Sequence, residues 1–190
     1  FAGLKSVSES KKNPNKYWSN NVDSTMNLLE AMEITGVKKI IFSSSAAVYG
    51  HSNDQPVNES SLINPSSVYG ETKQKCEEII KEFSDKEIVD AVVLRFFNLC
   101  GCHKEALFFE DPRTSESLMS EIIKVSLGNK DNLIIFGKNF HTRDGTPSRD
   151  FIHIEDLIEA HMLLINDCNI IKKYEIYNLG TGKDTTVLEL

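Results

Sequence analysis

Apolar positions recur along the chain in two periods, one helical and one extended, and the two alternate. A helical period covers residues 21–32, and Gly36 is its expected C-terminal stop. A second helix is predicted from about residue 68 to residue 83. Apolar runs rich in β-branched residues predict buried strands at residues 37–42 and 91–97. Strand, helix and strand at this spacing are typical of right-handed βαβ units in a parallel sheet.

The rest of the chain has a more broken pattern that predicts shorter elements. Residues 1–10 are expected to form a loop that leaves a strand, and Pro14 suits a first helical turn. The further expected elements are an irregular segment at 51–67, a loop at 101–115, a helix at 118–127, a strand at 133–136, a loop at 141–147, a strand at 151–154, a helix at 155–165, a strand at 174–179 and a helix start at 185–186. The fold class is therefore α/β, a Rossmann-type parallel sheet with a smaller interleaved α/β part.

The pattern changes near residue 98, which predicts two parts. Residues 1–97 are interpreted as the C-terminal part of a Rossmann domain, and residues 98–190 mainly as a second part with segments that return to the first. The chain starts at Phe1 without a Met, and it contains no glycine-rich fingerprint for a pyrophosphate. We therefore expect an internal fragment of a longer protein, in which the N-terminal βαβ units are missing.

Three side chains near the predicted strand ends carry the candidate chemistry. The first strand runs into hydroxyl residues that end at Ser45, and Tyr69 and Lys73 stand four residues apart at the start of the next helix. Residues four apart share one helical face. We expect the Lys73 charge to lower the phenol pKa of Tyr69 from its usual value near 10. Ser45 would hydrogen-bond a substrate hydroxyl whose proton Tyr69 takes. The alternative for Tyr69 and Lys73 is a solvated surface pair.

This arrangement resembles the Ser-Tyr-Lys triad of the extended short-chain dehydrogenase/reductase family. Further stretches are similar to its UDP-glucose (UDP-galactose) 4-epimerases: Phe-Ala-Gly-Leu-Lys at 1–5, Leu-Arg-Phe-Phe-Asn at 94–98, Phe-Gly at 136–137, Arg-Asp-Gly-Thr at 143–146, Ser-Arg-Asp-Phe-Ile-His at 148–153 and Tyr-Asn-Leu-Gly-Thr-Gly at 177–182. The resemblance runs nearly end to end.

The resemblance implies a tightly held NAD and a transient 4-keto sugar. It assigns residues 1–97 to an NAD-binding Rossmann domain and residues 98–190 mainly to binding of the nucleotide sugar. Tyr69 would take the proton of the sugar 4-hydroxyl while hydride leaves carbon 4, and hydride would return to the opposite face, interconverting UDP-glucose and UDP-galactose. Lys73 would also hydrogen-bond the nicotinamide ribose. The implied partner is a UDP-hexose, and the complete protein is expected to be a cytoplasmic homodimer through the helix pair around 22–35 and 68–83. These 190 residues alone are expected to be inactive.

The resemblance also implies site residues, carried over one by one. The implied catalytic residues are Ser45, Tyr69 and Lys73. The implied cofactor-binding residues are Phe1, Ala2, Gly3, Leu4, Lys5, Asn20, Tyr69, Lys73 and Phe97. The implied substrate-binding residues are Ser45, Tyr69, Asn98, Leu118, Ile134, Phe136 and Arg149, with Arg149 on the diphosphate and Ile134 and Phe136 beside the uracil. Ser117 stands where the family usually has Asn, which weakens the expected contact to the uridine.

Each of these positions has a plain structural alternative. Asn20 could only cap a helix, Phe97 and Phe136 could be core residues, and Arg149 could form a surface ion pair. His153 is interpreted as a packed or hydrogen-bonded strand residue and not as a catalyst.

Composition changes this picture little. A formal net charge of −7 and a pI near 5.3 disfavour nucleic-acid and anionic-membrane surfaces. No apolar run approaches the roughly 20 residues that span a bilayer. Cys100 and Cys102 are too close for a usual zinc knuckle and no second pair follows, so we expect free thiols in a reducing compartment and no metal.

Four other interpretations compete with epimerisation. A nucleotide-sugar 4,6-dehydratase would need an Asp-Glu pair after the triad hydroxyl, where this chain has Ala46 and Ala47. An NAD(P)-dependent reductase or decarboxylase acting on a nucleotide sugar is harder to exclude. A non-catalytic nucleotide-sugar-binding protein would be marked by loss of Tyr69 or Lys73, and both are present. A fragment serving only as an interaction module would bind no NAD.

Overall fold

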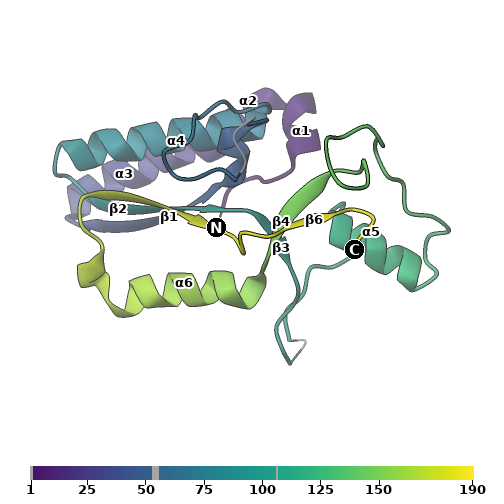
Figure 1. Cartoon of the computed structure of the whole chain (residues 1–190). Helices are drawn as coiled ribbons and strands as arrows, with labels where there is room; N and C mark the ends of the chain where they lie inside the picture. The colour runs from purple at the N-terminus through teal and green to yellow at the C-terminus, as the bar shows by residue number, and fades with distance from the viewer. Residues whose placement is uncertain (1, 53–55, 106) are drawn as a thin grey trace. The chain divides into compact units, whose positions relative to one another are not determined.

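The computed structural model describes residues 2–52, 56–105 and 107–190, and of Cys168 the backbone alone (Figure 1). Phe1, the first of the expected cofactor residues, lies outside the described residues. The chain divides into two compact units. Unit 1 comprises Phe1–Phe97 and Ala160–Leu179, and unit 2 comprises Asn98–Glu159 and Gly180–Leu190. The assignment of one part to NAD and the other to the nucleotide sugar stays a prediction.

Unit 1 contains a parallel three-stranded sheet in the order β1-β2-β5. Its elements are the helices α1 (Val7–Lys12), α2 (Pro14–Tyr17), the π-helix Trp18–Asp23, α3 (Ser24–Thr35), the 3₁₀ helix Ala46–Tyr49, α4 (Val68–Asp85) and the 3₁₀ helix Cys168–Ile170, and the strands β1 (Lys39–Ser45), β2 (Asp90–Phe96) and β5 (Tyr174–Leu179). This is the α/β, Rossmann-type arrangement that the sequence predicts.

Two apolar clusters cover the two faces of this sheet. On one face, Leu29 of α3 and Ile80 of α4 pack with Ala91 of β2. On the other face, Val92 and Leu94 of β2 pack with Leu164, which belongs to the unit 1 part of α6 (Ile154–Asn166). Side chains of a strand alternate between faces, so β2 needs apolar residues at successive positions, and its continuous apolar run follows from that. Figure 1 shows α3 and α4 on one side of the strands and α6 on the other.

The sequence predicts most of unit 1 correctly, with two differences. Gly36 ends α3 at φ 74°, and Pro14 opens α2. β1 continues through the serines to Ser45 because each of them pairs with β2 in register, which outweighs their polar character. Residues 1–10 are not all loop, since α1 begins at Val7. The Ser6 hydroxyl caps this short helix by accepting the backbone N–H of Glu9.

Unit 2 contains β3 (Asn98–Cys100), α5 (Leu118–Ser126), β4 (Ser148–His153), the first part of α6 and β6 (Asp184–Thr186). The predicted helix at 118–127 is confirmed as α5. The predicted strand at 151–154 is confirmed as a strand, but β4 begins earlier, at Ser148, and ends at His153, because Ile154 opens α6. The predicted strand at 133–136 is wrong, because that run has no strand partner among the described residues. The predicted helix start at 185–186 is also wrong: Thr186 pairs antiparallel with Ser148. Pairing with β4 therefore decides the conformation of residues 184–186, and their local sequence preference does not.

Candidate active site

The start of α4 is held in place by hydrogen bonds that fix where Tyr69 stands. The Ser67 hydroxyl accepts the backbone N–H of Gly70 at 3.1 Å, and the Ser10 hydroxyl accepts that of Tyr69 at 3.2 Å. A Cβ on Gly70 would lie 2.6 Å from the Ala47 carbonyl oxygen. Only glycine allows the helix this close to the chain that follows β1. Ser10 therefore belongs to the site, although nothing in its local sequence signals it.

The structure brings together the three side chains that the sequence selects. Ser45 closes β1, and its hydroxyl accepts the Ala47 N–H at 3.2 Å and lies close enough to the phenol of Tyr69 to lower the phenol pKa. Lys73 stands one turn further along α4, with Nζ 5.9 Å from the centroid of the Tyr69 ring. The ammonium donates to the Ser43 carbonyl oxygen at 2.7 Å and lies 4.8 Å from the centroid of the Phe42 ring. The interpretation of Tyr69 and Lys73 as a solvated surface pair is therefore wrong.

The expected lowering of the Tyr69 pKa is also wrong for the described chain. Burial raises the pKa of Tyr69, and the Ser45 hydroxyl opposes that rise without reversing it. The residue is only 7% exposed, so the phenolate would be poorly solvated. Burial lowers the pKa of Lys73, and the negative charge of Glu77 opposes this fall without reversing it. Lys73 is directed to the Ser43 carbonyl and not to the phenol oxygen, which explains why its charge does not lower the Tyr69 pKa.

The predicted cofactor segment at residues 2–5 is held by a side chain that the sequence reasoning missed. The Asn21 amide oxygen accepts the backbone N–H of Leu4 at 2.8 Å, and its amide nitrogen donates to the Leu4 carbonyl oxygen at 3.1 Å. The same nitrogen donates to the Thr72 hydroxyl of α4 at 3.2 Å. An ideal Cβ on Gly3 would lie 3.6 Å from Nζ of Lys73. Asn21 therefore joins the segment to the helix that carries Tyr69.

The neighbouring Asn20 lies on the π-helix and not at a helix start, so the interpretation as a simple cap is wrong. Its side-chain oxygen accepts the Leu4 N–H at 3.3 Å and thus shares this donor with Asn21. The signal that could have found Asn21 is an amide inside the apolar stripe that also holds Val22 and Leu29. A buried amide needs partners, and they lie far away in sequence.

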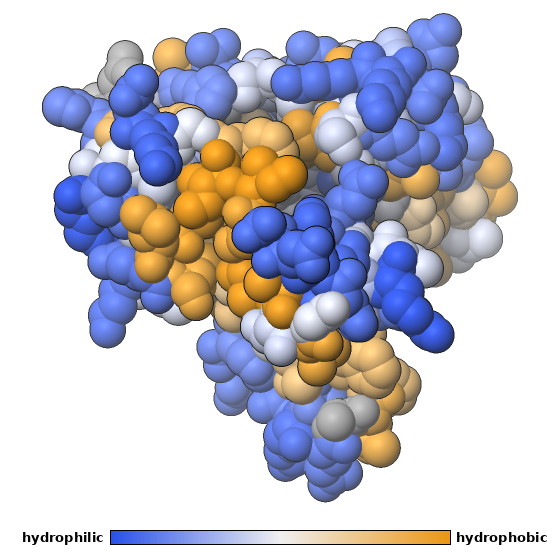
Figure 2. Space-filling view, turned by 90° about the vertical axis from the view of Figure 1, so that its right-hand side faces the viewer, coloured by the Kyte–Doolittle hydropathy of each residue, from blue (hydrophilic) through white to orange (hydrophobic). Residues whose placement is uncertain are grey.

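The candidates of unit 2 are mostly exposed. Asn98 is exposed at the first position of β3, and Leu118 is half-buried at the first position of α5. Ile134 is 60% and Phe136 is 83% exposed, so the core interpretation of Phe136 is wrong. Arg149 is exposed on β4 and donates to the Ser148 carbonyl oxygen. The space-filling view of Figure 2 shows apolar side chains at the surface among polar ones on the face that it presents.

Two further alternatives are settled by contacts. The Asp150 carboxylate beside Arg149 accepts from Thr181 and from the Gly182 backbone, which leaves the surface ion pair without support. His153 is a hydrogen-bonded strand residue, as expected, since its Nδ1 accepts the Glu155 N–H at 3.2 Å.

Comparison with known proteins gives the family. The family model described as the NAD dependent epimerase/dehydratase family matches residues 1–180. The chain belongs to this family.

This family member is similar to several epimerases over its whole length. UDP-glucose 4-epimerase 2 of Oryza sativa subsp. japonica is 42% identical over 195 residues, covering 100% of this chain and 48% of the relative. UDP-glucose 4-epimerase of Bacillus subtilis (strain 168) is 41% identical, covering 100% of this chain and 57% of the relative. The chain thus spans about half the length of the curated relatives it matches.

The backbone of this chain is also similar to that of a solved structure of an epimerase. The UDP-glucose 4-epimerase of Stenotrophomonas maltophila, with bound NAD and formylated UDP-arabinopyranose, has a TM-score of 0.94 and 38% identity. The match covers 100% of this chain and 57% of that one. The Rossmann-type fold is thereby confirmed.

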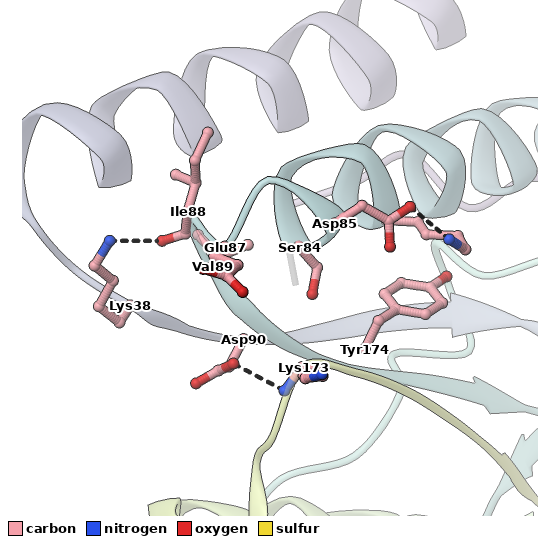
Figure 3. Close-up of a pocket in the computed structure, with 10 residues that line it drawn as sticks. Lys38, Ser84, Asp85, Glu87, Ile88, Val89, Asp90, Lys173 and Tyr174 are labelled. Atoms are coloured by element: carbon pink, nitrogen blue, oxygen red, sulfur yellow. Dashed lines mark hydrogen bonds and ion pairs between the residues drawn. The ribbon is translucent and has the colours of Figure 1, made fainter.

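One cavity of this family member lies away from Tyr69. It measures about 520 Å³ and opens at the amino ends of the strands, beside Asp90 of β2 and Tyr174 of β5, whereas Ser45 ends β1. Figure 3 shows that polar groups of its lining pair with one another, Lys38 with the Ile88 carbonyl and the Lys173 N–H with Asp90. Lys81 of the same lining pairs with Asp85. Parallel α/β sheets bind ligands at the carboxyl ends of their strands. This cavity is therefore not the candidate active site.

Other kinds of site find no support in the described chain. It has no group of three or more His, Cys, Asp or Glu side chains arranged to hold a metal ion. Cys76, Cys100 and Cys102 are free thiols. None of the helices within the described ranges is long and apolar enough to cross a membrane.

Proposed function

We propose that the complete gene product containing this chain is a UDP-glucose 4-epimerase, which interconverts UDP-glucose and UDP-galactose with NAD. The observation that carries the proposal is the meeting of Ser45, Tyr69 and Lys73 at the carboxyl end of β1. Similarity to UDP-glucose 4-epimerases over the entire chain supports it.

The residues around Lys73 fit a nucleotide cofactor. The ammonium is half-buried and, among the described residues, gives one hydrogen bond, to the Ser43 carbonyl, whereas an ammonium carries three donors. Gly3 lies beside it without a side chain, on a segment that Asn20 and Asn21 hold in place. Ala2, Gly3, Leu4, Lys5, Asn20, Tyr69, Lys73 and Phe97 would hold the NAD. When bound, NAD accepts hydride from the sugar and returns it.

Tyr69 and Ser45 handle the proton of the sugar 4-hydroxyl in this proposal. The Tyr69 phenolate would take the proton as carbon 4 is oxidised, and the resulting phenol would give it back as carbon 4 is reduced, so net redox is zero. Ser45 orients the substrate hydroxyl toward Tyr69. Because burial raises the pKa of Tyr69 in the chain by itself, the base form needs positive charge nearby. Lys73, whose Nζ lies 5.9 Å from the centroid of the Tyr69 ring, would supply part of this positive charge.

Unit 2 would supply the nucleotide-sugar contacts. A planar guanidinium such as that of Arg149 binds diphosphate oxygens in a bidentate way. Asn98 would contact the sugar diphosphate, and Leu118, Ile134 and Phe136 would flank the uracil. The high exposure of Ile134 and Phe136 supports a role in binding, because an exposed aromatic gains from covering by a ligand.

A dehydratase is the second candidate, since the family includes both activities. The residues after Ser45 argue against it. Ala46 and Ala47 begin the 3₁₀ helix that follows β1, and neither side chain can carry a proton. Elimination of water requires an acid and a base at these positions, so epimerisation is favoured.

The complete gene product is also proposed to be a cytoplasmic homodimer. Leu28 and Ile34 of α3 are 51% and 86% exposed, and a groove lined by Trp18, Glu71, Gln74, Lys75 and Glu78 follows the exposed side of α4. A second copy would cover these helices. Free thiols at Cys76, Cys100 and Cys102 suit a reducing compartment.

The test is the Tyr69→Phe variant of the complete gene product, assayed for both directions of UDP-hexose interconversion. Loss of a positioned proton-handling group is expected to lower the rate by at least about 10²–10⁴-fold, with NAD content unchanged. Tyr177→Phe, which removes an exposed hydroxyl from β5, is the matched control and keeps full activity. Unchanged turnover in Tyr69→Phe contradicts the proposed activity. Light scattering of the same samples measures their molar mass and so tests the proposed homodimer.

A further inference from the structure

The i, i+4 spacing of Tyr69 and Lys73 continues to Glu77, a buried carboxylate to which the proposed reaction gives no role. Glu77 is 5% exposed. Its Oε1 accepts the Ser44 hydroxyl at 2.5 Å, and its Oε2 accepts Nη2 of Arg95 at 2.6 Å. Nε of Arg95 donates to both oxygens, at 3.0 and 3.2 Å. The carboxylate is therefore fully paired, as a buried charge must be.

Arg95 extends this contact to the chain that follows Ser45. Its Nη1 donates to the Tyr49 hydroxyl at 2.9 Å, and its guanidinium carbon lies 5.0 Å from the centroid of the Tyr49 ring. The Tyr49 hydroxyl donates to the Asn178 side-chain oxygen at 2.7 Å. The network therefore joins α4, β2, β5 and the 3₁₀ helix after β1.

Three successive turns of α4 each contact one of the last three residues of β1, through side chains or the backbone. Tyr69 contacts Ser45, Lys73 contacts the Ser43 carbonyl, and Glu77 contacts the Ser44 hydroxyl. The side chains of a strand alternate, and the Ser43 hydroxyl accordingly lies 3.4 Å from Nε2 of His161 while that of Ser44 faces α4. A slip of α4 along β1 would break the Ser44 and Ser43 contacts and move Tyr69 away from Ser45.

We propose that Glu77, paired with Arg95, is a positioning residue for the reaction proposed above. It sets the register of α4 on β1, and it places a negative charge one helical turn from the Lys73 ammonium.

The second part of the proposal is electrostatic. Burial lowers the pKa of Lys73, while Cys76 and Glu77 raise it. The other groups that face Lys73 are the Tyr69 and Phe42 rings and the Ser43 carbonyl, and behind them lie His161, which contacts the Ser43 hydroxyl, and Arg95, which pairs with Glu77. Removing the charge of Glu77 also leaves the cation of Arg95 unbalanced. Both effects lower the pKa of Lys73 further.

The test compares Glu77→Gln with the double variant Glu77→Gln/Arg95→Met in the complete gene product. Measurements are kcat and KM for UDP-galactose, Tm, and the pKa of Lys73 from the pH dependence of its competitive acetylation, followed by mass spectrometry. In Glu77→Gln we expect kcat to fall by about 100-fold, the cost of a misplacement near 1 Å. KM changes little, and the Lys73 pKa falls. The basic limb of the kcat profile moves to lower pH with it.

The double variant separates positioning from folding. It removes both buried charges, so Tm should recover relative to Glu77→Gln. The kcat should stay low, because the pairing of Arg95 with Glu77 and the hydrogen bond from Arg95 to Tyr49 are both absent. If kcat recovers together with Tm, Glu77 is only structural and the proposal is overturned. An unchanged Lys73 pKa in Glu77→Gln overturns the electrostatic part.

Two further variants complete the test. Glu82→Gln, an exposed carboxylate of the same helix, is the control and should match the wild type. Ser44→Ala removes one hydrogen bond and no charge, and it serves if Glu77→Gln does not fold. A loss in kcat of about tenfold, within the range for small misplacements, is expected with the Lys73 pKa unchanged. Wild-type kcat in Ser44→Ala overturns the register part. If the wild type converts no UDP-hexose, the proposed function fails while acetylation still tests Glu77.

Discussion

Units 1 and 2 present their candidate functional side chains in opposite ways. In unit 1, Tyr69 is buried, its backbone is held by Ser10, and its phenol lies close to Ser45. In unit 2, Phe136 is exposed on irregular chain, and Arg149 is exposed on a strand. The difference matches the two tasks. Proton transfer needs atoms fixed to within a fraction of an ångström, whereas a nucleotide can be gripped by groups that the ligand itself orders.

The electrostatics of the two units differ in the same way. The central ion pair of unit 1, Glu77 with Arg95, is buried at 6% and 4% side-chain exposure. The ion pairs of unit 2, such as Arg143 with Asp184 and Arg113 with Asp111, are solvent-exposed. Exposed pairs contribute little to stability, whereas removing one partner of a buried pair is strongly destabilising because it leaves an uncompensated buried charge. Unit 1 should therefore be the less tolerant of single substitutions.

The largest expected effect is on the free energy of unfolding, and it is measured by comparing two separate Ile→Ala variants, one in each unit. Ile80→Ala, at 0% exposure in unit 1, should lower the free energy of unfolding by about 2–5 kcal/mol. Ile134→Ala, at 60% exposure in unit 2, should change it by less than about 0.5 kcal/mol. The second variant should instead raise KM for UDP-galactose by about tenfold, since apolar area on the uracil is lost.

Urea unfolding and steady-state kinetics of the complete gene product measure both quantities. Equal losses of stability in the two variants would contradict the contrast between the units. An unchanged KM in Ile134→Ala would remove that residue from the proposed uracil contact.

A smaller effect is expected for Arg149→Lys in unit 2. Lysine keeps the charge and loses the planar pair of donors, so KM should rise about 10- to 100-fold, the worth of one charge-assisted hydrogen bond. The free energy of unfolding should stay at the wild-type value. Arg113→Lys, an exposed arginine paired with Asp111, is the control and keeps the wild-type KM. Steady-state kinetics with UDP-galactose decide, and equal KM values in the two variants would exclude Arg149 as the diphosphate clamp.

The smallest expected effect is a loss of stability of unit 2 at low pH. Hydrogen bonds from Lys124 and Lys130 lower the pKa of Glu121 to about 2, and those from Arg143 lower the pKa of Glu189 to about 2. A carboxyl whose folded pKa is depressed stabilises the fold above its unfolded pKa, and this contribution is lost as pH falls through the folded value. Unit 2 should therefore loosen between about pH 4.5 and pH 2.

Amide hydrogen exchange at residues 98–159 measures this loss, with residues 24–45 of unit 1 as the internal reference. Glu121→Gln should flatten part of the pH dependence in unit 2. The same pH dependence in both segments would contradict the assignment to the carboxylates of unit 2.

Several elements follow from local sequence because their causes are local. Helix α3 ends at Gly36 since glycine accepts the left-handed backbone there. The apolar run of β2 and the spacing of Tyr69 and Lys73 on α4 are likewise visible in the chain. The run at 133–136 misled because an apolar segment becomes a strand only when another strand pairs with it.

By itself, the sequence determined the α/β class, the helix that carries Tyr69 and Lys73, and Ser45 as their hydroxyl partner. Only the tertiary structure decided that Asn21 joins Leu4 to Thr72, that Glu77 of α4 contacts Ser44 of β1, and that burial raises the pKa of Tyr69. The physical reason is distance along the chain: Asn21 and Thr72 are 51 residues apart, and Ser44 and Glu77 are 33 apart. Helical period and capping act within a few residues, whereas burial and hydrogen-bond partners exist only once the chain has folded.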